Sequence, residues 1–89
     1  MSEILAGLPN DPSEPARAAR AQFAANLRWQ RERAGLSQEA LATRCSMHRT
    51  EISMIERGKR APVLETIVLL ARGLELDSAA ELFEGISLI

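Results

Sequence analysis

The residues whose types and spacing could do chemistry gather between Leu36 and Arg60, where the sequence reads LSQEALATRCSMHRTEISMIERGKR. This pattern predicts two short helices joined by a tight corner, the second with polar side chains on its outward face. The outward positions are Arg49, Thr50, Ser53 and Met54. An α-helix with such a face fits the major groove of duplex DNA, where base edges can be told apart. The chemistry indicated is recognition rather than bond making.

Catalysis and metal binding are not indicated by the rest of the sequence. One cysteine and one histidine among 89 residues provide neither an internal disulfide nor a zinc-type cluster. The sequence also has no Ser/His/Asp set and no phosphate-cradling glycine loop. No signal-peptide pattern opens the chain, and the longest apolar run, 67–71, is far too short for a membrane span. We therefore expect a cytoplasmic protein that is not an enzyme and uses no metal or cofactor.

The net charge of −1 hides an uneven distribution. Residues 28–60 carry eight basic and four acidic side chains, a net charge of +4, whereas residues 61–89 carry −4 and residues 1–27 carry −1. Phosphate binding requires a local basic patch rather than a basic chain. Ordinary solvated surface charge is the alternative explanation, and the asymmetry alone does not decide between the two.

An all-α fold of five helices is predicted to position these side chains. Ser37 is placed to cap the second helix, and Ser78 and Glu81 have capping-box spacing before the last. Gly35 and Gly58 stand where helices commonly stop, and the fourth helix is expected to end near Gly73. The expected helices span about 15–34, 38–44, 49–57, 64–72 and 78–83. The inward positions around the corner are Leu41, Ala42, Cys45, Met47, Ile52 and Ile55.

Two regions of different character divide the chain. Residues 1–14 contain Gly7, Pro9 and Pro12, which resist regular structure, and we expect a flexible arm there. Residues 15–89 are expected to form one compact domain, with the two helices and their corner at about 37–57.

The motifs GLSQEALA, HRTEISMIERGKR and APVLETI together resemble the lambda-repressor/Cro type of helix-turn-helix domain, the XRE family of transcriptional regulators. The second motif is also similar to controller proteins of restriction–modification systems. The resemblance covers more than half of the chain. It implies a compact five-helix domain that binds double-stranded DNA, usually as a homodimer.

The resemblance assigns phosphate contacts and a structural ion pair. Gln38 matches a glutamine that contacts a phosphate at the start of a helix, where free N–H groups and the helix dipole attract anions. Arg31 and Glu56 match a salt bridge between the first and third helices, and Arg31 is also a candidate for a phosphate contact. The loop residues expected to follow the DNA backbone are Arg57, Lys59 and Arg60, with plain solvated charges as the alternative.

The base-reading candidates are the outward residues of the third helix together with Glu51. Positions matching Arg49, Thr50 and Met54 read bases in the family, and Ser53 lies nearer the flank. Arg49 has the geometry to pair with guanine O6 and N7, although a phosphate contact is an open alternative. Glu51 could accept from cytosine N4, or it could serve the helix start three places after His48.

Four residues depart from the family pattern or stand apart from it. Ser46 occupies the corner where many members have glycine, so a positive φ there would strain it. Gln30 stands where leucine is common, and Trp29 where a polar residue is common. We expect Trp29 to cover an edge of the core, with a dimer contact as the alternative. Cys45 is interpreted as a small apolar filler.

The apolar C-terminal segment supplies the candidates for a homodimer interface, which are Leu82, Phe83, Ile86, Leu88 and Ile89. Closing the core of the monomer is their alternative role. A dimer would place two readers on half-sites about one helical turn apart, which favours a palindromic operator. A different class of function is also open: a protein-binding module, such as an antitoxin or adaptor, whose DNA binding is secondary.

Overall fold

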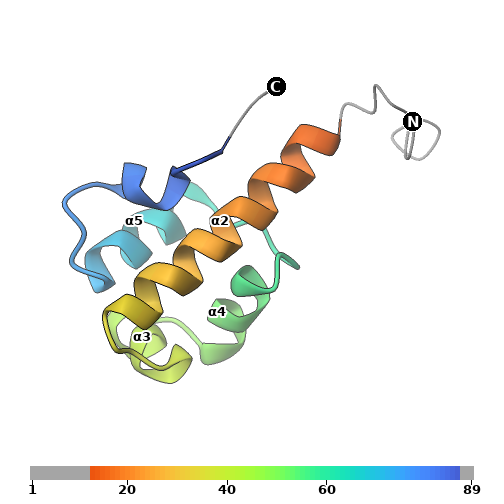
Figure 1. Ribbon diagram of the computed structural model, residues 1–89. Helices are drawn as coiled ribbons and strands as arrows, with labels where there is room; N and C mark the ends of the chain where they lie inside the picture. Colours follow the sequence, from red (N-terminus) through yellow and green to blue (C-terminus); the bar gives the residue numbers. More distant parts are fainter. Residues whose placement is uncertain (1–12, 87–89) are drawn as a thin grey trace.

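The computed structural model describes residues 13–86, which are helical and contain no strand within that range (Figure 1). The elements are α2 (Glu14–Arg33), α3 (Gln38–Cys45), α4 (Arg49–Glu56), α5 (Leu64–Gly73) and the 3-10 helix η1 (Ala79–Phe83). The predicted all-α class is confirmed, although the last element is a 3-10 turn rather than a fifth α-helix. Most of the predicted arm, and Leu88 and Ile89, lie outside the described residues. Glu14, assigned to the arm, begins α2 instead.

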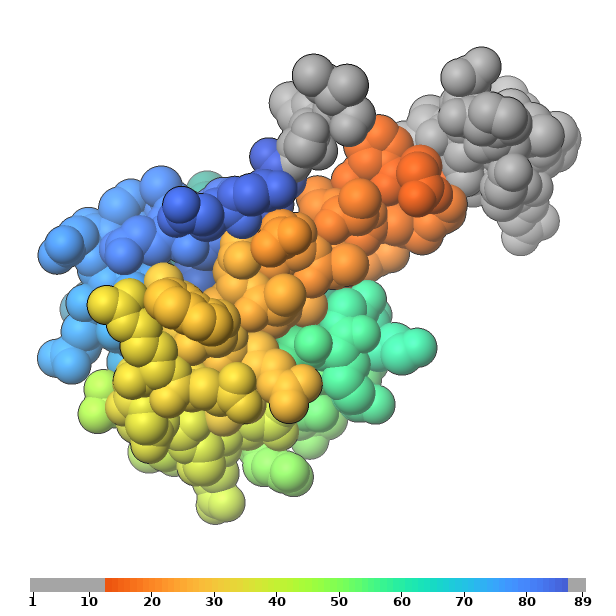
Figure 2. Space-filling view, in the orientation of Figure 1, coloured from red at the N-terminus to blue at the C-terminus, as the bar shows by residue number. Residues whose placement is uncertain are grey.

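α2 is the long helix, and α4 and η1 pack against it, whereas α3 packs against α4 and α5. η1 and the segment after it lie along α2 (Figures 1 and 2). Asn26 ties the two together, because its Nδ2 donates to the carbonyl oxygens of Leu82 at 3.0 Å and Glu84 at 2.8 Å. The fully buried aliphatic side chains come from every element and are Leu27, Leu41, Ile52, Ile55, Leu70 and Leu82.

Leu82, a candidate for the dimer interface, is buried in the monomer instead. Its side chain has no exposed surface, so it closes the core of its own monomer and presents nothing to a partner. Phe83 remains 43% exposed but packs its ring edge against Phe23, with the ring centroids 5.5 Å apart. Ile86 is partly buried against the core.

The four α-helices within residues 13–86 end in the same way, with a left-handed residue followed by a backbone hydrogen bond that reaches back into the last turn. At the end of α3, Ser46 has φ 54° and the N–H of Met47 donates to Ala42 O at 2.9 Å. Two of these positions are glycines and two are not. They are Gly35, Ser46, Gly58 and Glu75.

Gly73 does not end α5 as a left-handed residue, because Glu75 takes that place with φ 57°. Gly73 lies inside the helix, and a Cβ built on it would meet Cys45 Sγ at 2.5 Å. The glycine is therefore needed for the close approach of α5 to α3. None of the helices within residues 13–86 is long and apolar enough to cross a membrane.

Candidate nucleic-acid interface

Local hydrogen bonds cap the starts of both α3 and α4. Ser37 Oγ accepts from the N–H of Ala40 at 3.0 Å, which caps α3 as the sequence indicated. At α4 the N-cap is His48, and its N–H lies 3.5 Å from Glu51 Oε1, the reach-back half of a capping box. The structure thus gives Glu51 a part in starting α4.

The outward side of α4 carries the predicted base-reading residues on one exposed edge. Arg49 and Thr50 are exposed in its first turn, and Ser53 and Met54 are half-buried one turn later. Opposite them, Ile52 and Ile55 are buried in the core. The helix is therefore held by two isoleucines while its first turn faces solvent, an arrangement that can enter a groove.

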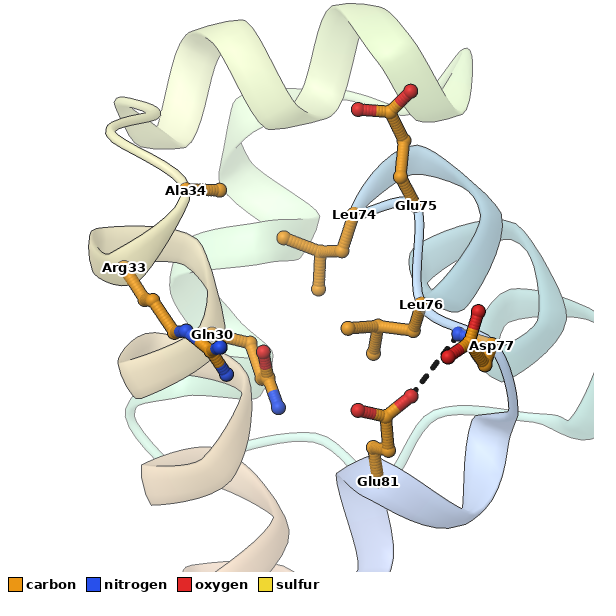
Figure 3. A pocket seen from close by; sticks show the side chains of 8 residues that line it. All are labelled: Gln30, Arg33, Ala34, Leu74, Glu75, Leu76, Asp77 and Glu81. Carbon is orange, nitrogen blue, oxygen red and sulfur yellow. Dashed lines mark hydrogen bonds between the residues drawn. The ribbon is translucent and has the colours of Figure 1, made fainter.

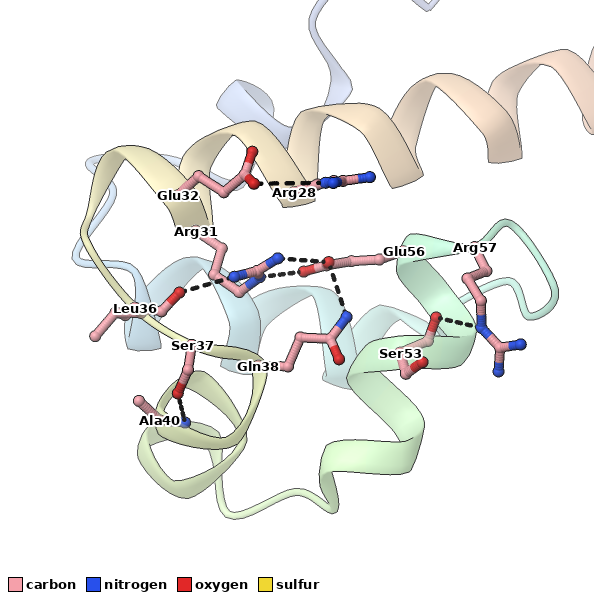
Figure 4. Close-up of polar contacts among 10 residues, drawn as sticks. All are labelled: Arg28, Arg31, Glu32, Leu36, Ser37, Gln38, Ala40, Ser53, Glu56 and Arg57. Carbon is pink, nitrogen blue, oxygen red and sulfur yellow. Dashed lines mark hydrogen bonds and ion pairs between the residues drawn. The ribbon is translucent and has the colours of Figure 1, made fainter.

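Arg31 and Glu56 form a bidentate ion pair between α2 and α4 (Figure 4). Arg31 Nε donates to Glu56 Oε2 at 2.7 Å, and a second nitrogen donates to Oε1 at 3.0 Å. The guanidinium also donates to the carbonyl of Leu36 at 2.8 Å. The hydrogen bonds that Arg31 donates to Glu56 raise the pKa of Arg31, against the lowering effect of burial. With the Glu56 side chain only 3% exposed, the pair is a joint between helices rather than a surface contact.

Gln38 joins this network from the start of α3. Its Nε2 donates to Glu56 Oε1 at 3.2 Å, so one of its two amide hydrogens is already bonded within the protein (Figure 4). This bond fixes the Gln38 side chain beside the first turn of α3. The remaining amide hydrogen and the backbone N–H groups of that turn are the donors that a phosphate could use.

The three basic residues after α4 do not behave alike. Arg57 folds back on its own helix, with Nε 3.4 Å from Ser53 O and a terminal nitrogen 3.2 Å from Met54 Sδ. Lys59 and Arg60 are exposed beyond Gly58. Arg57 is thus placed beside the reading face, whereas the other two extend from the loop.

Of the two α2 residues that depart from the family pattern, Trp29 differs from expectation. Trp29 is 57% exposed and does not cover the core edge, because its ring faces solvent with the Arg33 guanidinium 5.1 Å from its centroid. Gln30, by contrast, is buried. Cys45 fits its predicted filler role: it is buried, its Sγ lies 3.3 Å from Leu69 O, and burial raises the pKa of the thiol. Within residues 13–86, no group of three His, Cys, Asp or Glu side chains could hold a metal ion.

Comparison with known proteins decides the family. Residues 22–83 match the model of a helix-turn-helix domain. The chain belongs to this helix-turn-helix family. The match spans α3, the corner and α4, together with most of the core. The resemblance inferred from the three motifs is thereby confirmed.

The chain is also similar to individual known proteins. The control protein C.SmaI of Serratia marcescens is 43% identical over 52 residues, which cover 58% of this chain and 62% of that relative's length. The restriction-modification controller protein C.AhdI of Aeromonas hydrophila superimposes with a TM-score of 0.70 at 38% identity, covering 72% of this chain and 96% of its own. A hypothetical transcription factor from Neisseria gives 0.69 at 37% identity, covering 73% of this chain and 74% of its own. The similarity to restriction–modification controllers extends over most of the described fold.

Proposed function

We propose that this protein is a sequence-specific, double-stranded DNA-binding transcriptional regulator that acts in the cytoplasm as a homodimer on a palindromic operator. The observation that carries the proposal is the exposed first turn of α4, with Arg49 and Thr50 outward on a helix anchored by two buried isoleucines. Membership of the helix-turn-helix family and likeness to controller proteins support it. The function is binding rather than catalysis.

Base reading is assigned to the outward face of α4. Arg49 pairs with a guanine edge, Thr50 contacts a thymine methyl group or a phosphate, and Met54 and Ser53 face the bases further along the groove. Glu51 is the remaining reading candidate. Its carboxylate is close enough to His48 N to start the helix, and its second oxygen is free for a cytosine N4 donor.

Phosphate contacts are assigned to groups on both sides of that face. Gln38 and the first-turn N–H groups of α3 lie on one side, and the loop residues Lys59 and Arg60 on the other. Arg31 acts through Glu56, because both terminal nitrogens of its guanidinium are engaged within the protein. Arg57 is assigned to a phosphate next to Met54, the residue on which it rests.

The proposed homodimer rests on apolar surface that the monomer leaves uncovered. α5 and the residue before it expose four large aliphatic side chains, an unusual density for a helix ten residues long. A small domain reads few base pairs by itself, so two copies on two half-sites supply the affinity that one lacks. We assign the interface to these residues, which are Val63, Leu64, Val68 and Leu69.

Selection of duplexes from a random pool, followed by mobility shifts on the selected site, tests the proposal. We expect the selected site to be a palindrome.

Arg49→Ala should relax the base preference at one position per half-site, at a cost of about 1–3 kcal/mol. Lys59→Ala should weaken all duplexes alike and reduce the salt slope by about one unit per monomer. The exposed Arg33, in the last turn of α2, gives a control of equal charge outside the α5 surface assigned to the dimer, since Arg33→Ala should leave both properties unchanged. Absence of binding to any duplex at low salt would reject the function.

A further inference from the structure

An apolar groove of about 300 Å³ runs along the first half of α2, and eight of its nine lining residues are apolar. Phe83 is the largest exposed side chain in it, because 43% of its surface remains accessible after its ring edge has packed on Phe23. The hollow at the other end of α2 differs, since half of its eight lining residues are charged (Figure 3). The walls of the groove are formed chiefly by Ala16, Ala19, Phe23, Pro62, Ile67 and Phe83.

Arg20 is the one charged residue that lines the groove. It is half-buried and has no hydrogen-bond or ion-pair partner within residues 13–86. A guanidinium carries five N–H donors, and partial burial removes some of the water that would otherwise satisfy them. The occupant that suits this groove therefore combines an apolar surface with hydrogen-bond acceptors.

The wall that the first turns of α2 contribute lies outside the range of the family match, which begins at residue 22. Ala16, Ala19 and Arg20 belong to this additional part of the chain, and so does the whole segment that precedes α2. The groove and the segment that leads into it are thus features that this chain has beyond the matched helix-turn-helix domain.

The segment before α2 has the composition of such an occupant. Residues 3–8 read EILAGL, with three large aliphatic side chains, and residues 1–12 contain two carboxylates and no Lys or Arg to repel Arg20. Residues 9–12 read PNDP, a composition typical of turns, which can reverse the chain before α2 begins. Each peptide unit of the segment also offers a carbonyl oxygen to a guanidinium.

The spacing of Leu5 and Leu8 matches the length of the groove. In an extended segment of the polyproline II type, residues three apart lie on the same face, about 9 Å from each other. The α2 wall extends over the seven positions from Ala16 to Phe23, about 10.5 Å along the helix axis. A reversal over residues 9–12 would bring Leu8 to the Ala16 end and Leu5 to the end formed by the two phenylalanines.

We propose that residues 4–8 dock in the groove of their own chain, with Leu8 beside Ala16, Leu5 against Phe83, and Arg20 donating to a carbonyl oxygen between them. A weak contact is sufficient, because the tether through residues 9–12 keeps the segment at an effective concentration on the order of millimolar. Docking gives a place to a segment for which the sequence alone predicts no regular structure. It goes beyond the proposed function and does not depend on DNA binding.

The test is nuclear magnetic resonance of the full chain, labelled at the methyl groups of Ala, Ile and Leu and at the rings of its two phenylalanines. We expect nuclear Overhauser cross-peaks from Leu5 to the Phe83 ring and from Leu8 to Ala16. Absence of both would overturn the proposal. A mixture of methyl-labelled chains with ring-labelled chains reports contacts between copies. Cross-peaks of full strength there would assign the groove to the segment of a second copy and overturn docking within one chain.

Variants connect the cross-peaks to stability. Leu5→Gln and Leu8→Gln together should abolish them and raise the unfolding equilibrium constant in urea by at least about tenfold, because apolar burial is lost. Both positions precede α2, so the helices should still form. Ala6→Gln adds the same side chain on another face of the segment and should change neither property. An unchanged unfolding constant in the double variant, or an equal change in Ala6→Gln, would overturn the proposal.

Discussion

At the scale of single residues, the ion pairs of this protein are of two kinds, one buried between helices and one exposed on the surface of α2. Arg31 and Glu56 are bidentate and mostly buried, whereas Arg28 and Glu32 on the same helix lie 3.6 Å apart with more than half of each side chain exposed. Removing one member of a buried pair leaves the other desolvated without a partner. An exposed pair loses almost nothing, because water replaces the missing charge.

Glu56→Ala is therefore expected to destabilise the protein by about 3–5 kcal/mol, a large part of the roughly 5–15 kcal/mol that holds a typical domain folded. Glu32→Ala is the matched control and should cost under about 1 kcal/mol. Urea unfolding followed by circular dichroism measures both. Equal losses in the two variants would show that the Arg31–Glu56 pair is not the joint between α2 and α4.

Ser46 carries backbone strain at the corner, with φ 54° and ψ 41°. Left-handed conformation costs an L-residue roughly 1–2 kcal/mol, and glycine gives back about half of the gain through its freer unfolded chain. Ser46→Gly should stabilise the protein by about 0.5–1 kcal/mol. Gly58→Ser is the reverse change. Gly58 has φ 69° and a new Cβ there meets nothing within 4 Å, so the variant should lose stability through backbone strain alone. Thermal unfolding measures the change in stability of each variant. A change of the same sign in both would show that the left-handed conformation does not strain Ser46.

At the scale of elements, each helix within residues 13–86 begins and ends within one residue of its predicted bounds. Ser37 and the Ser78–Glu81 pair signal their caps directly, because each cap depends on residues within three positions of one another. α5 ends at Gly73 as expected, but the glycine is needed there for the contact with Cys45 on α3, 28 positions away in the sequence. A local sequence pattern cannot distinguish a glycine that is needed for a positive φ from a glycine that is needed for the close approach of two helices.

The contact between Gly73 and Cys45 gives a test at this scale. Gly73→Ala should destabilise the protein by about 1–3 kcal/mol, because the new methyl group overlaps Cys45 Sγ. With Cys45→Ala already present, the same change should be harmless or stabilising, since alanine favours a helix by about 1 kcal/mol over glycine. A double-mutant cycle in urea measures the coupling. Additive effects would show that the close approach does not limit the packing of α5 on α3.

At the scale of the whole molecule, the fold separates regions that the sequence only hinted at. The segment with a net charge of +4 contains α3, α4 and the loop after them, whereas four of the five acidic side chains of residues 61–89 follow α5, on the connection to η1, on η1 and directly after it. Sequence patterns placed the reading helix and its polar face. They could not place Gln30, Trp29 or Leu82, because burial at those positions depends on how η1 packs along α2. Asn26, which makes that packing specific, carried no signal beyond its residue type.

If the proposed homodimer forms, the exposed surface of the monomer predicts where its interface lies. Leu64 and Val68, 73% and 45% exposed, are one helical turn apart on α5 and have no partner for their exposed surface within residues 13–86. Phe83 is exposed to a similar degree as Val68 but already packs on Phe23. The outer surface of α5 is therefore the better candidate for the proposed dimer interface, because association there would bury apolar surface that folding has left in water.

Replacing Leu64 and Val68 together by glutamine should convert the dimer to a monomer in sedimentation velocity at concentrations where the native chain is dimeric. The loss of two buried aliphatic side chains, about 1.5–3 kcal/mol each per subunit, predicts at least a hundredfold rise in the dissociation constant. Folding should survive, because both side chains are exposed in the monomer. Half-site binding should persist while affinity for the palindrome falls. Phe83→Gln is the comparison: if it dissociates the dimer and the α5 variant does not, the interface lies at η1 and the C-terminal segment, where the sequence first placed it.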